Sequence, residues 1–304
     1  MSEYLLTTNG LTKEFGGHKA VNGVDMHIKK GAIYGFIGRN GAGKTTFMKM
    51  ISGLSAPTKG EISLFGYSGS DLKKVRGRVG CLIENPGLYP DMNAYENLKL
   101  KCIASGVNKK SYMDELLEIV GLEDVGKKST QHFSLGMKQR LGIAIALAGE
   151  PDLLVLDEPI NGLDPQGIME VRETLQKLNT ERDITIIISS HILEELSKIA
   201  TDYGIIHNGV LLQELTAEEL NKRCSERIEL TLTNPKNALP VLDKLGITNY
   251  SVVDKEHIHI FERINDSALI NAELTKEGII VSEIKLKSEE LENYYMELTG
   301  GVEK

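Results

Sequence analysis

The chain contains the stretch Gly38-Arg39-Asn40-Gly41-Ala42-Gly43-Lys44-Thr45, which fits the pattern G-x-x-x-x-G-K-[S/T]. It lies between a predicted strand, Ala32 to Ile37, and a predicted helix from about Lys44 to Gly53, and the pattern requires this context. Glycines there let successive backbone N–H groups turn inward around phosphate oxygens, and the helix N-terminus adds its positive end. A flexible turn is the alternative, but the stretch predicts a phosphate-binding loop.

The chemistry of this loop depends on its last two residues and on a neighbouring strand. We expect Lys44 to bring a point charge to the β and γ phosphates and the Thr45 hydroxyl to ligate Mg²⁺. The run LLVLDE, residues 153–158, ends in two carboxylates at the C-terminal end of a buried strand, where ligands bind in open α/β sheets. Asp157 is predicted to hold Mg²⁺, directly or through water, and Glu158 to accept a proton from attacking water. Two solvated carboxylates at a strand end are the alternative.

The pattern around these motifs indicates a doubly wound α/β core. The runs LLVLDEP and DITIIISSH are typical of buried parallel strands, and they flank an amphipathic segment from Gln166 to Asn179. Helical spacing dominates the 60 or so residues before them. Further short strands are predicted at Tyr4–Thr8, Val24–Ile28, Ile62–Leu64 and Arg78–Ile83, with turns at Asn9-Gly10, Gly16-Gly17 and Lys30-Gly31.

After about Leu220 the pattern changes. The expected order is strand, helix, strand, strand, helix, strand and a final helix, Ser288 to Leu298, which suggests a split βαβ sandwich. Its strands include residues 229–232, 257–260 and 279–284, and its helices span about 235–245 and 265–276. We therefore expect one domain over residues 1–223, with a helical subdomain at about 85–150, and a small α+β domain over 224–304.

Composition limits the functional classes. The 304 residues carry 43 acidic and 35 basic side chains, a net charge of −8, which disfavours broad nucleic-acid binding. The longest apolar runs are strand-sized, far short of the roughly 20 residues of a membrane helix. Three widely spaced cysteines argue against a disulfide framework or a zinc cluster and fit a reducing cytoplasm. Glycine is in excess, at 30 residues, and several of these glycines lie in the predicted phosphate loop.

The segment FSLGMKQR, residues 133–140, resembles the LSGGQ signature of ABC ATPases. Ser134 and Gly136 match, whereas Phe133, Leu135 and Met137 depart. Ser134 can still cap the helix that begins here while its hydroxyl and the Gly136 amide face a phosphate. The resemblance covers about residues 4–220 and implies an ATP-hydrolysing, P-loop NTPase core with a β-rich N-terminal subdomain. It also implies a head-to-tail homodimer, in which this helix end meets the γ phosphate bound by the opposite subunit.

Other family landmarks follow in order, and their roles are those that the resemblance implies. Phe15 matches the aromatic residue that stacks on adenine, and Asp164 lies in the loop that links the two sites of the dimer. His191 matches the switch histidine that contacts the γ phosphate and orients Glu158 and the water. Taken singly, a core phenylalanine, a bare turn and a structural histidine are the alternatives. The implied catalytic residues are Lys44, Glu158 and His191; the implied nucleotide contacts are Phe15, residues 38–45, Thr46, Ser134, Gly136 and Asp164.

Glu84 stands where most members of the family have a glutamine that links Mg²⁺ and the attacking water to the transmembrane partner. A carboxylate can still ligate Mg²⁺, so the expected metal ligands are Thr45, Glu84 and Asp157. Glutamate at this position and SLGMKQR resemble the ATPases of lantibiotic-immunity and bacitracin-resistance transporters. Residues 225–304, with the closing segment LENYYMELTG, resemble the small C-terminal extension of drug- and bacitracin-type exporter ATPases. Neutral drift is the alternative.

The resemblance implies a peripheral subunit on the cytoplasmic face of the membrane, held by separate permease subunits, that exports antimicrobial peptides. Export of another drug, lipid or small molecule is the alternative within the family. A soluble ABC ATPase acting on DNA or ribosomes fits less well, because such proteins usually carry two cassettes or a long coiled coil. A phosphate-loop kinase would leave Ser134 to Arg140 and His191 without a role.

Overall fold

The computed structural model describes residues 3–224, 226–233, 235–287 and 291–299. Within these ranges the chain divides into two compact units, one up to Ala217 and one from Glu218 onward. The division lies before the boundary that the sequence predicts near Cys224, because helix α7 (Ala217–Cys224) belongs almost entirely to the second unit.

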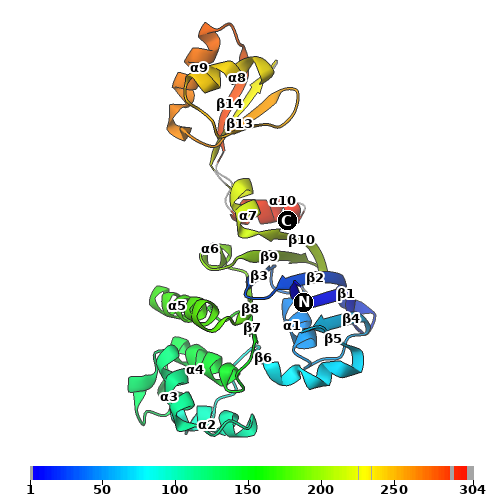
Figure 1. Ribbon diagram of the computed structural model, residues 1–304, viewed down its shortest axis with the longest axis vertical. Helices are drawn as coiled ribbons and strands as arrows, with labels where there is room; N and C mark the ends of the chain where they lie inside the picture. The colour runs from blue at the N-terminus through cyan, green and yellow to red at the C-terminus, as the bar shows by residue number, and fades with distance from the viewer. Residues whose placement is uncertain (1–2, 225, 234, 288–290, 300–304) are drawn as a thin grey trace. The chain divides into compact units, whose positions relative to one another are not determined.

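The first unit contains an antiparallel sheet formed by β1 (Tyr4–Phe15), β2 (His18–Lys29), β4 (Lys59–Leu64) and β5 (Tyr67–Ser68), in the order β2-β1-β4-β5 (Figure 1). The predicted turn at Asn9-Gly10 is wrong. Strand β1 continues through it with a shift in register, because Gly10 adopts φ +56° and its N–H donates to Asp25 Oδ1 at 2.5 Å.

A second sheet carries the motif-bearing strands in the order β10-β9-β3-β8-β7-β6 (Figure 1). Its members are β3 (Ile33–Ile37), β6 (Val79–Leu82), β7 (Leu153–Asp157), β8 (Thr185–Ser190), β9 (Asp202–His207) and β10 (Val210–Thr216). All neighbours are parallel except β9 and β10. Every residue of β3, β7 and β8 is buried, which explains their continuous apolar runs.

Helices cover this sheet and fix the position of the loop. Helix α1 (Lys44–Ile51) packs Phe47, Met48, Met50 and Ile51 into one core with both sheets. Helices α5 (Pro165–Arg182) and α6 (Leu193–Ser197) follow β7 and β8. The parallel register places Ile37 beside Ser190 and Asp157 beside Ser189, so the carboxyl ends of β3, β7 and β8 meet at one edge. This arrangement confirms the predicted α/β core.

Three helices gather beyond β6, namely α2 (Ala94–Ala104), α3 (Lys110–Ile119) and α4 (Leu135–Leu147) (Figure 1). Helix α2 begins with a capping box, in which the Asn93 side chain accepts from the Glu96 N–H and the Glu96 carboxylate accepts from the Asn93 N–H. Tyr112 of α3 donates a hydrogen bond to Leu147 O at 2.7 Å, which ties α3 to the end of α4.

The second unit is the predicted split βαβ sandwich. Its strands β11 (Arg227–Leu232), β12 (Tyr250–Val252), β13 (His257–Ile260) and β14 (Val281–Lys287) pair antiparallel in the order β12-β13-β11-β14. Helices α8 (Pro235–Lys244) and α9 (Ser267–Lys276) share an apolar core with the sheet. Helix α10 spans Leu291–Leu298; residues 288–290 of the predicted final helix lie outside the described residues.

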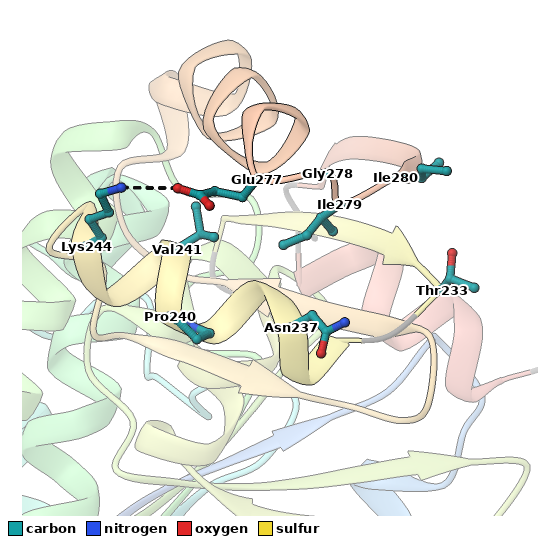
Figure 2. A pocket seen from close by; sticks show the side chains of 9 residues that line it. All are labelled: Thr233, Asn237, Pro240, Val241, Lys244, Glu277, Gly278, Ile279 and Ile280. Carbon is teal, nitrogen blue, oxygen red and sulfur yellow. Dashed lines mark hydrogen bonds and ion pairs between the residues drawn. The ribbon is translucent and has the colours of Figure 1, made fainter.

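A cavity of about 500 Å³ opens in this unit between α8 and the segment leading into β14 (Figure 2). An ion pair of 3.2 Å between Lys244 Nζ and Glu277 Oε1 lies at one end of the cavity. The exposed side chain of Ile280 also lines it. Across the part of the chain that the structure describes, no helix combines the length and apolar character needed to cross a bilayer.

Candidate active site

The loop between β3 and α1 is held by close backbone approaches that exclude side chains. Gly43 adopts φ +108°, and a Cβ placed there would lie 2.4 Å from Ala20 O. A Cβ at Gly38 would lie 2.7 Å from Ile206 O. Both glycines are therefore required by the fold as well as by phosphate chemistry. The loop lines a cavity of about 200 Å³.

The cavity brings together almost the whole predicted loop. Its lining comprises Ala20, Arg39, Asn40, Gly41, Ala42, Gly43, Lys44, Thr45, Thr46 and Glu158. Ala20 of β2 was missed by sequence reasoning, which gave no signal for it. Its contribution shows that the antiparallel sheet supplies one wall of the candidate site.

Lys44 is 6% exposed, and its ammonium group is held from two sides. It donates to Gly38 O at 2.6 Å, and Nζ lies 3.1 Å from Glu158 Oε1. The second contact is an ion pair without hydrogen-bond alignment, because Glu158 Oε1 has no hydrogen-bond partner among the described residues. Lys44 thus spans from its own loop to the carboxylate at the end of β7.

Asp157 receives two hydroxyl donors. Thr45 Oγ1 donates to Asp157 Oδ2 and Ser189 Oγ donates to Asp157 Oδ1, both at 2.6 Å. A hydroxyl oxygen and a carboxylate so close together, at the edge of the phosphate loop, are the hard oxygen donors that Mg²⁺ prefers, so these residues fit the ion. Ser189 was not among the predicted site residues. It is fully buried at the end of β8, and a polar residue closing an apolar run was the signal.

Glu158 is fixed by its backbone and by His191. Its φ of +49° places a non-glycine residue in the left-handed region, which costs about 1–3 kcal/mol. Its N–H donates to Ser189 Oγ at 2.9 Å, and its Oε2 lies 2.8 Å from His191 Nδ1. Lys44, Glu158 and His191, the predicted catalytic residues, therefore form one chain of contacts.

The other predicted nucleotide contacts lie outside the lining of this cavity. Ser134 is the N-cap of α4, with Oγ accepting from Met137 N at 3.2 Å, as predicted. Asp164 is the N-cap of α5, with Oδ1 accepting from Gly167 N at 3.1 Å. A Cβ at Gly136 would lie 3.8 Å from Leu163 Cδ2, so the two caps belong to neighbouring segments. Phe15 is 55% exposed at the end of β1.

Glu84 does not join Asp157 and Thr45. It adopts φ +65° just after β6, and its Oε1 accepts from Lys49 Nζ of α1 at 2.6 Å. Its side chain is 61% exposed. Of the three predicted metal ligands, Thr45 and Asp157 are therefore in contact, whereas Glu84 forms an ion pair with Lys49.

The fold and the site define a P-loop nucleoside triphosphatase. A mostly parallel sheet carries a glycine-rich loop before α1, Asp157 and Glu158 at the end of β7, and His191 after β8. Residues 21–161 match the ABC transporter family model. Relatives 42% and 44% identical over 98% of the chain place it among the ATP-binding proteins of ABC transporters.

Two relatives and one solved structure illustrate this relationship. The chain is 42% identical to the bacitracin transport ATP-binding protein BcrA of Bacillus licheniformis, over 98% of both chains. It is 45% identical to the lantibiotic transport ATP-binding protein SrtF of Streptococcus pyogenes, over 69% of this chain and 90% of that one. The dimeric ATP-binding cassette MJ0796 bound to ADP and Pi is 26% identical, with a TM-score of 0.63 over 70% of this chain and 98% of that one.

Proposed function

We propose that this protein is the ATP-hydrolysing subunit of an exporter of antimicrobial peptides, and that it acts as a homodimer held by separate permease subunits. The contact chain from Lys44 through Glu158 to His191, at the phosphate-loop cavity, carries the proposal for hydrolysis. The cargo class is supported by the two relatives named for bacitracin and lantibiotic transport.

Hydrolysis follows from what these side chains do. Thr45 and Asp157 would hold Mg²⁺, with Glu84 as a third ligand once it leaves Lys49, and the bound ion would neutralise phosphate charge. Lys44 turns from Glu158 towards the phosphates. Glu158 then accepts a proton from the water whose oxygen forms the new bond to the γ phosphorus, while the bond to the ADP oxygen breaks. His191 keeps the Glu158 carboxylate oriented. The products are ADP and inorganic phosphate.

The homodimer is supported by the N-terminus of α4, which lies outside the lining of the loop cavity. Ser134 and Gly136 lie at the N-terminus of α4, where the positive end of the helix dipole and backbone N–H groups attract a phosphate. They line no part of their own chain's loop cavity. A head-to-tail pair would bring this helix end to the γ phosphate in the partner, beside Asp164, and would assemble two shared sites.

The permease partner is supported by the exposed apolar side chains of the helical subdomain. Tyr89, Leu100 and Ile103 are 58%, 43% and 52% exposed. We assign this surface, on and near α2, to the permease at the cytoplasmic face of the membrane. Closure of the dimer would then move the subdomain and transmit the motion to the transport path.

The proposal is tested in cells and by copurification. The protein is purified with its bound membrane partner, and the bacitracin and lantibiotic sensitivity of cells carrying the wild type or Glu158→Gln is compared. We expect a permease to copurify with both and the variant to restore sensitivity to one peptide class. If wild-type and variant cells show the same sensitivity to bacitracin and the same sensitivity to lantibiotics, the cargo assignment is removed and another exported drug or lipid is favoured. Copurification of ribosomes or DNA with no permease would overturn the transporter assignment.

A further inference from the structure

Lys49 and Thr45 lie four residues apart on α1, so they occupy the same face of the helix, one turn from each other. The rise of an α-helix separates such positions by roughly 6 Å along the axis. Thr45 directs its hydroxyl to Asp157, and Lys49 directs its ammonium group to Glu84. Glu84 is therefore paired with a residue of α1 that lies one helical turn beyond Thr45, the residue that contacts Asp157.

The segment that carries Glu84 is anchored on one side and strained at Glu84 itself. A Cβ at Gly142 of α4 would lie 2.8 Å from Pro86 Cβ, so Pro86 packs closely on that helix. The backbone of Glu84 has φ +65°, a conformation that residues other than glycine rarely adopt. Pro86 is thus fixed on α4, whereas the backbone of Glu84 adopts a strained conformation that a change in its own φ would relieve.

We propose that Lys49 is a positioning residue that competes with Mg²⁺ for Glu84. The inference rests on the proposed function. In the nucleotide-free chain the Lys49 ion pair holds Glu84 off the metal position, and the carboxylate leaves Lys49 for Thr45 and Asp157 when the magnesium nucleotide binds. Lys49 thereby raises the concentration of Mg²⁺ at which Glu84 becomes a ligand.

The exposure of the pair makes this exchange feasible. The Lys49 and Glu84 side chains are 36% and 61% exposed, so water screens their attraction and the pair is weak. A divalent cation beside two phosphates and Asp157 attracts a carboxylate more strongly than one exposed ammonium group does. The competition is therefore expected to have a small, measurable effect, about two- to fivefold in affinity.

The test measures binding rather than turnover. The affinity for a non-hydrolysable ATP analogue is determined with Mg²⁺ and with EDTA, and the ratio of the two affinities is compared among variants. We expect Lys49→Gln to raise the ratio about two- to fivefold, Lys49→Arg to keep the wild-type ratio, and Lys49→Gln in a Glu84→Gln background to change nothing further. Lys74→Gln is the matched control, because it removes one lysine from an exposed pair with Asp71 in the same unit.

An unchanged ratio in Lys49→Gln overturns the inference, and so does an equal rise in the Glu84→Gln background. A wild-type protein that gains no affinity from Mg²⁺ contradicts the proposed function itself, so the two failures are distinct. Thermal unfolding of each variant guards against misfolding, and Lys49→Met serves as a second variant if Lys49→Gln does not fold.

Discussion

The ammonium nitrogen of Lys44 lies 3.1 Å from Oε1 of Glu158, so the lysine of the phosphate loop and the proposed general base form an ion pair. Both side chains are largely buried, at 6% and 20% exposed. A phosphate that attracts Lys44 would at once release Glu158 for proton transfer. Under the proposed mechanism, one lysine would therefore link nucleotide binding to activation of the base.

Lys44→Ala is expected to lower ATP affinity at least about 100-fold, because the only buried cation among the residues lining the loop cavity is lost. Fluorescent nucleotide titration measures the loss. Lys74→Ala, which removes an exposed lysine paired with Asp71, should bind as the wild type does. Tight ATP binding by Lys44→Ala would contradict the assignment of the loop.

His191→Ala should lower kcat about 10- to 100-fold and leave ATP affinity nearly unchanged. The reason is that His191 Nδ1 lies 2.8 Å from Glu158 Oε2 and orients the base without lining the cavity. Steady-state hydrolysis and equilibrium binding separate the two effects. His257→Ala, in the second unit, is the control. A variant that weakens binding as much as turnover would assign His191 to substrate binding instead.

Ser134→Asp distinguishes a cap from a phosphate contact. Aspartate caps a helix about as well as serine, so α4 should keep its stability. Its charge would repel the γ phosphate bound by the partner, and we expect hydrolysis to fall at least about 10-fold while ATP binding to the monomer persists. Thermal unfolding, binding and hydrolysis are compared with Ser134→Thr. Wild-type hydrolysis by Ser134→Asp would remove Ser134 from the shared site.

Burial raises the pKa of Tyr112 to about 12, so its hydroxyl remains protonated in the folded chain above the pH at which it ionises in the unfolded chain. The raised pKa contributes stability that is complete below about pH 10 and is lost as the pH rises towards 12. Tyr112→Phe should lose about 0.5–1.5 kcal/mol at pH 8 with the bond to Leu147 O.

Urea unfolding at pH 8 and above pH 10 measures both changes. The pKa of Tyr34 is also raised, chiefly by burial, but its contribution cancels in the difference between wild type and Tyr112→Phe. The difference in the free energy of unfolding between wild type and Tyr112→Phe should become smaller above pH 10. A difference that stays constant would show that Tyr112 ionises alike in both states.

Sequence patterns predicted the elements whose chemistry is local. The loop before α1, the acidic end of β7 and the Ser134 cap each depend on residues close together in the chain. The local sequence therefore predicts all three. The continuation of β1 through Asn9-Gly10 was missed, because Asp25 of another strand accepts the Gly10 N–H. A prediction from local turn preference does not include a hydrogen-bond partner on another strand.

The parts of the site that escaped prediction depend on contacts across the fold. Ser189 reaches Asp157 only through the parallel register of β7 and β8, and Ala20 reaches the loop from another sheet. Glu84 was expected at the metal, but Lys49 holds it elsewhere. The division of the chain before α7 likewise follows from tertiary packing, for which the sequence shows only a change of pattern.

Glu158 is proposed to activate water for ATP hydrolysis within a homodimer, and the Glu158→Gln variant tests this role. Light scattering with ATP and phosphate release are measured on the same preparations of variant and wild type. We predict that ATP drives the variant into a stable dimer and that its hydrolysis falls at least about 100-fold. Hydrolysis at the wild-type rate by Glu158→Gln would show that Glu158 is not the general base.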